Sequence, residues 1–225
     1  MRKLYHFNGG VHPPQHKSES TLHPILKPPL PERLVIPLHQ HIGNTAKPLV
    51  GEGERVLKGQ KIGSAEGYVS SAIHAPTSGR ILSVAHEPVP HPSGLKDLCI
   101  SIEPDGREEW VELVPVDHLN TDPSSLRNRL RDAGVVGLGG AVFPSFIKLN
   151  PSSKKVRTLV LNGAECEPYI TCDDMLMRER AAEIVEGAKI MRHMLQAEEI
   201  LLGIEDNKPE AISAMKAAAG SEIEV

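Results

Sequence analysis

Proline is unevenly distributed along the chain, and this restricts the possible folds more than any other feature. Fifteen of the 19 prolines precede residue 125 in a chain of 225 residues. Proline lacks a backbone N–H and has a fixed φ, so it disrupts helix interiors and central strands. Because domains usually contain about 100 to 150 residues, the sequence predicts two units that follow different structural rules.

The proline-rich half is predicted to contain an arm and a β domain. Residues 1–30, which include Pro13-Pro14 and Pro28-Pro29, are expected to form an extended arm that packs against another surface. Over residues 31–118, short apolar runs alternate with turn residues, which is typical of a small all-β domain. The clearest predicted strands are 34–36, 73–75, 81–84 and 98–102.

Residues 119–225 are predicted to form a Rossmann-like domain. Asp122-Pro123-Ser124 is a capped start for a short basic helix over 125–133. Strand, helix, strand, helix then implies a parallel sheet with right-handed crossovers. Two strands make a poor sheet, so we expect a domain that is truncated in this chain. The predicted strands are 156–161 and 200–204, and the predicted helices are 174–196 and 207–219.

Composition argues against several functional classes. The net charge of -4 lacks the basic excess of a nucleic-acid-binding protein. No apolar run approaches the ~20 residues of a membrane span, and the first ten residues contain no apolar signal core. The chain is therefore predicted to be soluble and cytoplasmic. Its three cysteines, Cys99, Cys166 and Cys172, are too few for a disulfide framework or for one iron–sulfur cluster.

Two segments of the β domain, residues 51–63 and 73–81, resemble the half-motifs of the biotinyl/lipoyl barrel. Carrier domains of that family present a modified lysine on the hairpin between the halves, but residues 64–73 contain no lysine. The barrel is therefore predicted to serve docking and not group transfer. The fold class predicted for the whole chain is α+β, with a biotinyl/lipoyl-like β barrel-sandwich followed by an incomplete Rossmann-like domain.

Histidines raise the question of a metal site. His39 and His41, placed on a strand, would face the same side, and His12 and His16 lie near each other in the arm. No third ligand is placed by the sequence, whereas a metal needs at least three. We therefore predict hydrogen-bonded or surface histidines and no metal.

Residues 137–148, which continue the glycine-rich loop that begins at Gly134, are the first candidate binding segment. Gly137, Gly139 and Gly140 allow backbone amides to approach a phosphate, and Lys148 can neutralise its charge. Val142 stands where the dinucleotide fingerprint requires its third glycine. The alternative interpretation is a tight glycine turn that packs a helix on a strand.

An acidic loop, residues 162–169, is the second candidate. It follows the strand predicted at 156–161, and ligands of open α/β sheets bind at the carboxyl ends of strands. The Asn162 amide can hydrogen-bond the edge of a flavin ring, and the carboxylates of Glu165 and Glu167 can accept from a ribose or carboxamide. The alternative is an acidic loop that caps the helix beginning near Asp174.

These two loops, in this order and spacing, resemble those of the flavin- and NADH-binding subunit of respiratory complex I. The whole chain, including the segments 7–14 and 204–211, is more similar to the amino-terminal part of the C-subunit family of Rnf electron transport complexes. Transferred by motif, the resemblance implies FMN contacts for Gly137, Gly139, Gly140, Lys148, Asn162 and Glu165, and NADH contacts for Phe143 and Glu167.

The resemblance also implies a function: the peripheral electron-input subunit of a membrane-bound, ion-translocating ferredoxin:NAD oxidoreductase, on the cytoplasmic face of the inner membrane. Electrons would pass between NAD(H), FMN and two [4Fe-4S] clusters, whose cysteine runs are absent from this sequence. Expected partners are the other subunits, with neither nucleic acid nor a direct membrane span. No catalytic side chain is expected, and this chain alone is expected to be inactive. The alternative is a non-catalytic docking subunit of the same kind of complex.

Overall fold

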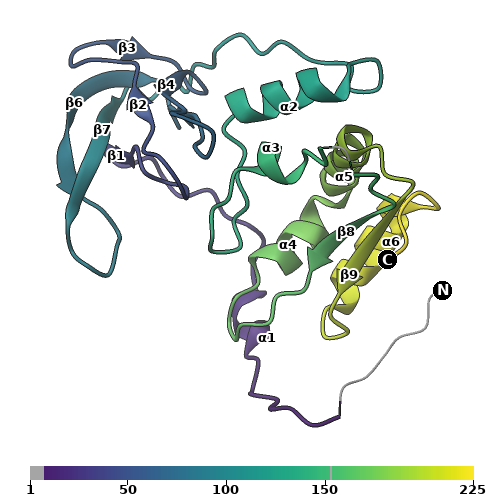
Figure 1. Ribbon diagram of the computed structural model, residues 1–225. Helices are drawn as coiled ribbons and strands as arrows, with labels where there is room; N and C mark the ends of the chain where they lie inside the picture. Colours follow the sequence, from purple (N-terminus) through teal and green to yellow (C-terminus); the bar gives the residue numbers. More distant parts are fainter. Residues whose placement is uncertain (1–7, 153) are drawn as a thin grey trace. The chain divides into compact units, whose positions relative to one another are not determined.

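The computed structural model describes residues 8–152 and 154–225, and the chain divides into two compact units (Figure 1). One unit contains residues 28–150, and the other contains the described parts of 1–27 and 151–225. The sequence-based domain boundaries, after residues 30 and 118, stay predictions. The first seven residues of the predicted arm lie outside the described residues.

The unit of residues 28–150 is built on two antiparallel sheets. The four-stranded sheet has the order β1-β7-β6-β3, and the three-stranded sheet has the order β2-β4-β5. In the long hairpin β6–β7, Arg80 pairs with Glu103 and Pro88 with Lys96. The strands are β1 (Leu34–Pro37), β2 (Lys47–Pro48), β3 (Arg55–Val56), β4 (Lys61–Ser64), β5 (Ile73–His74), β6 (Gly79–Pro88) and β7 (Lys96–Pro104).

The core of this unit consists of β-branched and other aliphatic side chains, which suit pleated, half-buried surfaces. Ile81, Ile100 and Ile102 face inward from the β6–β7 hairpin and are at most 1% exposed. Alternation along β6 places Arg80 and Leu82 outside, as a strand with one buried face requires. The four strands predicted most clearly from the sequence are thus confirmed.

The strand predicted through His39 and His41 is wrong. β1 ends at Pro37, and residues 38–45 form bends and irregular backbone. Pro37 has no N–H to donate, which favours the end of a ladder there. His41 is 4% exposed, and its Nε2 lies 3.0 Å from both the Asn44 carbonyl oxygen and Ser70 Oγ. It is therefore a hydrogen-bonded core histidine.

Two helices follow the sheets within the same unit. α2 (Pro123–Asp132) begins as predicted, because the Asp122 carboxylate accepts from the backbone N–H groups of Ser124 and Ser125. Lys61 Nζ lies 2.7 Å from Asp132 Oδ1 and ties α2 to β4. α3 (Ser145–Lys148) is a single turn at the end of the glycine-rich loop.

Two histidines, the buried His41 and the half-buried His74, make the stability of this unit depend on pH. Burial is the main cause that lowers the pKa of both His41 and His74, and the charge of Lys61 lowers that of His74 further. Below pH ~6.5, the ordinary histidine value, the unfolded chain binds more protons than the folded chain. The free energy of unfolding is therefore highest above that pH and falls as the pH decreases from 7.5 to 5.5.

Thermal unfolding at the two pH values tests this expectation, with wild type expected to have the lower Tm at pH 5.5. The matched control is His86→Gln, an exposed histidine on β6, which should keep the full pH dependence. His41→Gln should reduce it. If the Tm changed with pH equally in wild type and in the His41→Gln variant, the pH dependence could not be assigned to His41.

The other unit contains a parallel pair of strands with helices. β8 (Thr158–Gly163) pairs in parallel with β9 (Glu199–Ile204), from Thr158 with Glu199 to Gly163 with Ile204. α4 (Cys172–Glu179) and α5 (Ala181–Leu195) connect the strands, and α6 (Pro209–Ala219) follows β9. The predicted β–α–β–α order is confirmed, and with it the α+β class.

The single helix predicted over 174–196 is wrong. Arg180 has φ −130° and ψ 28°, which separates α4 from α5. The apolar period continues across this break, because Met177, Ala181 and Ile184 belong to or pack on one core. That core also contains Val185, Ala188, Ile200, Leu202, Ala211, Met215, Ala219 and Ile223.

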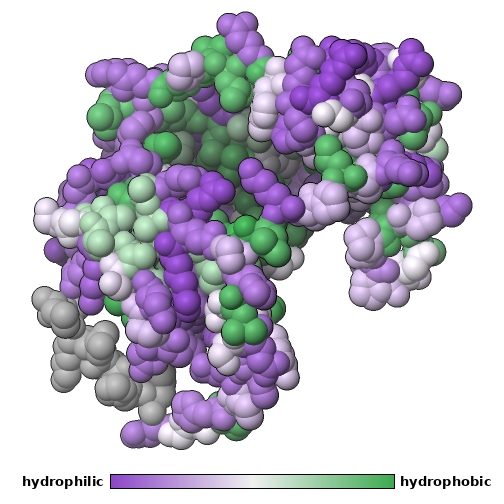
Figure 2. Space-filling model, turned by 180° about the vertical axis from the view of Figure 1, so that it is seen from behind, coloured by the Kyte–Doolittle hydropathy of each residue, from purple (hydrophilic) through white to green (hydrophobic). Residues whose placement is uncertain are grey.

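The predicted arm is irregular apart from one helical turn, α1 (Lys17–Ser20), and its described residues up to Lys27 group with the β8–β9 unit. In the described residues no helix is long and apolar enough to cross a membrane. On the face drawn in Figure 2, hydrophobic residues are interspersed among hydrophilic ones.

Candidate functional site

The glycine-rich loop leaves a set of backbone donors without acceptors. The Gly137 N–H donates to the Phe143 carbonyl at 2.9 Å and closes the loop. Between these residues, the N–H groups of 138–142 donate to no acceptor in the described part of the chain. Gly140 has φ +93°, and a β-carbon on Gly139 or Gly140 would meet nothing within 4 Å. The loop therefore presents open, unpaired amides.

Lys148 supplies a positive charge beside these amides. Its Nζ lies 2.6 Å from the position that a Gly137 β-carbon would occupy and 5.9 Å from the centroid of the Phe143 ring. Among the described residues, no carboxylate pairs with Lys148. Successive unpaired amides next to an ammonium group form a site for an anion, so the residues present fit a phosphate group.

Close packing explains only part of this loop. Gly134, with φ +70°, lies against the barrel, and a β-carbon there would overlap the Ala72 carbonyl oxygen. Gly139 and Gly140 make no such approach. The alternative of a tight packing turn therefore accounts for Gly134 and leaves the open amides of 138–142 unexplained.

The acidic loop begins where β8 ends. Asn162 Oδ1 accepts from the Ala164 N–H at 3.0 Å, which turns the chain out of the strand. Glu165 is 4% exposed, and its carboxylate accepts from the N–H groups of Asp173 at 2.8 Å and Asp174 at 3.4 Å. It thereby satisfies two donors at the start of α4, as the capping alternative requires. The Glu167 side chain is exposed.

The carboxylate of Glu165 also affects its neighbours. A hydrogen bond to Glu165 at 3.2 Å is the main cause that raises the pKa of the Cys172 thiol. Burial, followed by the charge of Glu165, raises the pKa of Asp173. Cys172 is therefore held as a thiol, which does not suit a reactive redox cysteine. Within the described residues, one group of side chains could in principle ligate a metal, because its ligand atoms lie within 4.8 Å of one another: Glu165, Cys172 and Asp173.

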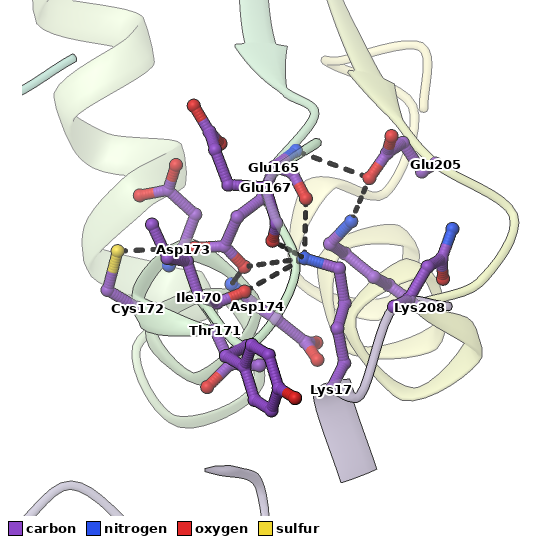
Figure 3. A network of polar contacts seen from close by, with 12 residues as sticks. Lys17, Glu165, Glu167, Ile170, Thr171, Cys172, Asp173, Asp174, Glu205 and Lys208 are labelled. Carbon is purple, nitrogen blue, oxygen red and sulfur yellow. Dashed lines mark hydrogen bonds and ion pairs between the residues drawn. The ribbon is translucent and has the colours of Figure 1, made fainter. Parts of the chain in front are cut away.

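Lys17, in the arm, is a component of this site that the sequence analysis missed (Figure 3). Its ammonium group donates to the backbone carbonyls of Glu165, Glu167 and Ile170. The two segments are about 150 residues apart, and a single lysine in a proline-rich arm carries no sequence pattern that would reveal the contact.

A second lysine, Lys208, reaches the loop through Glu205. Lys208 is 0% exposed and pairs with Glu205, whose carboxylate also accepts from the Glu165 N–H at 3.3 Å. Burial would raise the pKa of Glu205, but the hydrogen bonds from Lys208 and Glu165 outweigh it and hold that pKa below its usual value. The acidic loop thus contacts Lys17 directly and the Lys208–Glu205 pair through the Glu165 N–H.

The predicted site residues belong to both units. Gly137, Gly139, Gly140, Phe143 and Lys148 lie in the unit of residues 28–150. The three residues of the acidic loop, Asn162, Glu165 and Glu167, lie in the unit with β8 and β9. Their assignments to FMN and NADH remain predictions.

Comparison with known proteins first defines the class. Residues 5–107 match the family model described as the RnfC barrel sandwich hybrid domain, and residues 130–225 match the Nuo51 FMN-binding domain. The chain therefore combines a barrel-sandwich domain with an FMN-binding domain. This agrees with the two antiparallel sheets of the first segment.

The relatives then define the family. The chain is 48% identical over 217 residues, 96% of its length, to proteins named as the C subunit of an ion-translocating oxidoreductase complex. It covers 33% of the protein from Haemophilus influenzae strain 86-028NP, 26% of that from strain KW20 and 35% of that from Yersinia pestis Antiqua. The chain belongs to this family and corresponds to its amino-terminal part, between 26% and 35% of the length of these relatives.

Proposed function

We propose that the chain is part of the electron-input subunit of an Rnf-type complex, which transfers electrons between NAD(H), FMN and iron–sulfur clusters. The observation that carries this proposal is the loop 137–148, in which five unpaired amides and Lys148 form an anion site. That loop lies within the segment that matches an FMN-binding domain. FMN would supply hydride acceptance from a nicotinamide and one-electron donation to clusters.

The chain's own residues bind and orient. The amides of 138–142 and Lys148 bind the phosphate, with Gly137, Gly139 and Gly140 leaving space for it. Asn162 and Glu165, in the acidic loop, contact the flavin. Phe143 and Glu167 contact the nicotinamide nucleotide. Glu167 is the exposed carboxylate of that loop and is suited to accept from a ribose or carboxamide.

The wider assignment follows the relatives. We propose that other subunits of a membrane complex, at its cytoplasmic face, are the partners and that NAD(H) is the soluble redox partner. Two [4Fe-4S] clusters are proposed for the electron pathway of the complex, although the three cysteines here cannot bind them.

A docking role is the second candidate. The observation that favours it is the engagement of the Glu165 carboxylate in the cap of α4, where each of its oxygens accepts from a backbone N–H group. In that case the barrel and the arm bind neighbouring subunits, and flavin does not bind the loop.

Titration of the 225-residue chain with FMN, followed by quenching of flavin fluorescence, separates the two functions. We expect saturable quenching in wild type. Lys148→Ala should weaken binding by about tenfold or more, because hydrogen bonds to charged groups contribute roughly 1.5 to 3 kcal/mol. Gly140→Val should have a similar effect, since a branched side chain at φ +93° is strained and covers the amides.

Lys47→Ala is the matched control, because Lys47 is an exposed lysine of the same unit on β2. It should bind FMN like wild type. Absence of saturable quenching in wild type, or equal affinity in the Lys148→Ala variant, would contradict the flavin assignment and favour the docking role.

A further inference from the structure

The ammonium group of Lys17 is enclosed by the backbone of the acidic loop and the residue after it. Nζ lies 2.5 Å from the Glu165 carbonyl oxygen, 3.2 Å from that of Glu167 and 2.8 Å from that of Ile170. The Glu165 carboxylate is 4.0 Å away, and the Lys17 side chain is 10% exposed. An ammonium has three N–H donors, and the three carbonyls use all of them (Figure 3).

The arm fixes the same loop at a second point, Tyr169. This residue has φ +66°, a conformation that costs roughly 1 kcal/mol or more for a residue with a β-carbon. Its N–H donates to the Gln15 carbonyl at 2.9 Å, and its own carbonyl accepts from Ser20 Oγ at 2.6 Å. The His16 ring stacks on the Tyr169 ring, with 4.8 Å between the ring centroids and an angle of 7° between the ring planes.

These contacts determine how the acidic loop is presented. Lys17 turns the carbonyls of Glu165 and Glu167 toward the arm, which sets the orientation of the peptide groups that follow these two residues. The buried Glu165 side chain is directed to α4, and the Glu167 side chain is left exposed. Without a cation at this position, three carbonyls and a carboxylate would face one another, and their mutual repulsion would open the loop.

We propose that Lys17 is a positioning residue for nucleotide binding: its ammonium group organises the acidic loop from the amino-terminal arm, so that Asn162 and Glu167 are held ready for flavin and NADH. This inference rests on the function proposed above. It assigns the arm a role in nucleotide binding that is separate from the roles of the glycine-rich loop and the barrel.

The test is Lys17→Ala in the 225-residue chain, with Lys27→Ala as the matched control. Lys27 is exposed in the same arm, and within the described residues it makes no ion pair or hydrogen bond. Hydrogen exchange of the Tyr169 amide should become about tenfold faster or more in the Lys17→Ala variant, because the loop opens locally. Amides of β8 and β9 should keep their rates. FMN affinity should fall about fivefold or more.

Chemical rescue gives a readout that a general loss of stability would not show. Ammonium chloride should restore slow Tyr169 exchange and FMN affinity to the Lys17→Ala variant, because NH4+ fits a cavity of three carbonyls and donates N–H bonds. Tetramethylammonium chloride at the same concentration has no N–H donor and should not restore them.

Failure of this inference is distinguishable from failure of the proposed function. Unchanged Tyr169 exchange in the Lys17→Ala variant would overturn the organising role, whatever the flavin result. Faster exchange with unchanged FMN affinity would overturn the positioning role and leave flavin binding intact. If wild type itself binds no FMN, the proposed function fails, and the positioning role for nucleotide binding fails with it.

Discussion

The Gly79→Ala variant is expected to lose about 3 kcal/mol or more of unfolding free energy, with the unit of residues 28–150 affected first. Gly79 begins β6 and pairs with Pro104 on β7. A β-carbon there would overlap the Glu103 carbonyl oxygen and lie 3.1 Å from Pro104 Cα. Because the obstructing atoms are backbone atoms of a paired strand, they can move only by breaking the ladder.

Urea denaturation followed by circular dichroism measures this loss. Arg80→Ala is the control, since Arg80 is the exposed neighbour on the same strand, and its effect should stay within about 0.5 kcal/mol. A loss below about 1 kcal/mol in the Gly79→Ala variant would show that β6 and β7 can separate without cost at this point.

The second large effect is expected from Lys208→Met, which removes the ammonium group and keeps much of the side-chain volume. Lys208 is fully buried and pairs with Glu205. Its loss leaves a partly buried carboxylate without a cation, which should cost about 2 to 4 kcal/mol. The Glu205 side chain is 28% exposed, so water offsets part of the penalty.

A double variant identifies the cause. Lys208→Met combined with Glu205→Gln removes the unpaired charge, and at least half of the lost unfolding free energy should return in urea denaturation. The control is Lys155→Met, which breaks an exposed pair with Glu198 at 2.7 Å and should change stability by less than about 1 kcal/mol. No recovery in the double variant would assign the loss to packing and not to charge.

Much of the architecture could be predicted from the sequence because it depends on local patterns. Proline content separates the β half from the helical half, and apolar alternation marks β6 and β7. Asp122-Pro123-Ser124 marks the start of α2, because capping uses side chains within three residues. The glycine-rich loop could be recognised for the same reason, since free φ and a missing β-carbon are properties of the residue itself.

Other features could not be predicted because the relevant energies come from distant residues. The break at Arg180 leaves the apolar period intact, so no periodicity could reveal it. Glu165 has the same local sequence whether it contacts a flavin or caps α4, and its burial against Asp173 and Asp174 is visible only in three dimensions.

The sequence by itself determined the two kinds of unit, the order of their main strands and helices, and the place of the glycine-rich loop, because these follow from backbone restrictions and from the spacing of apolar side chains. Only the tertiary structure decided that Lys17 organises the acidic loop. That contact joins residues about 150 positions apart, and its strength comes from burial of a charge among carbonyls, which no local pattern encodes.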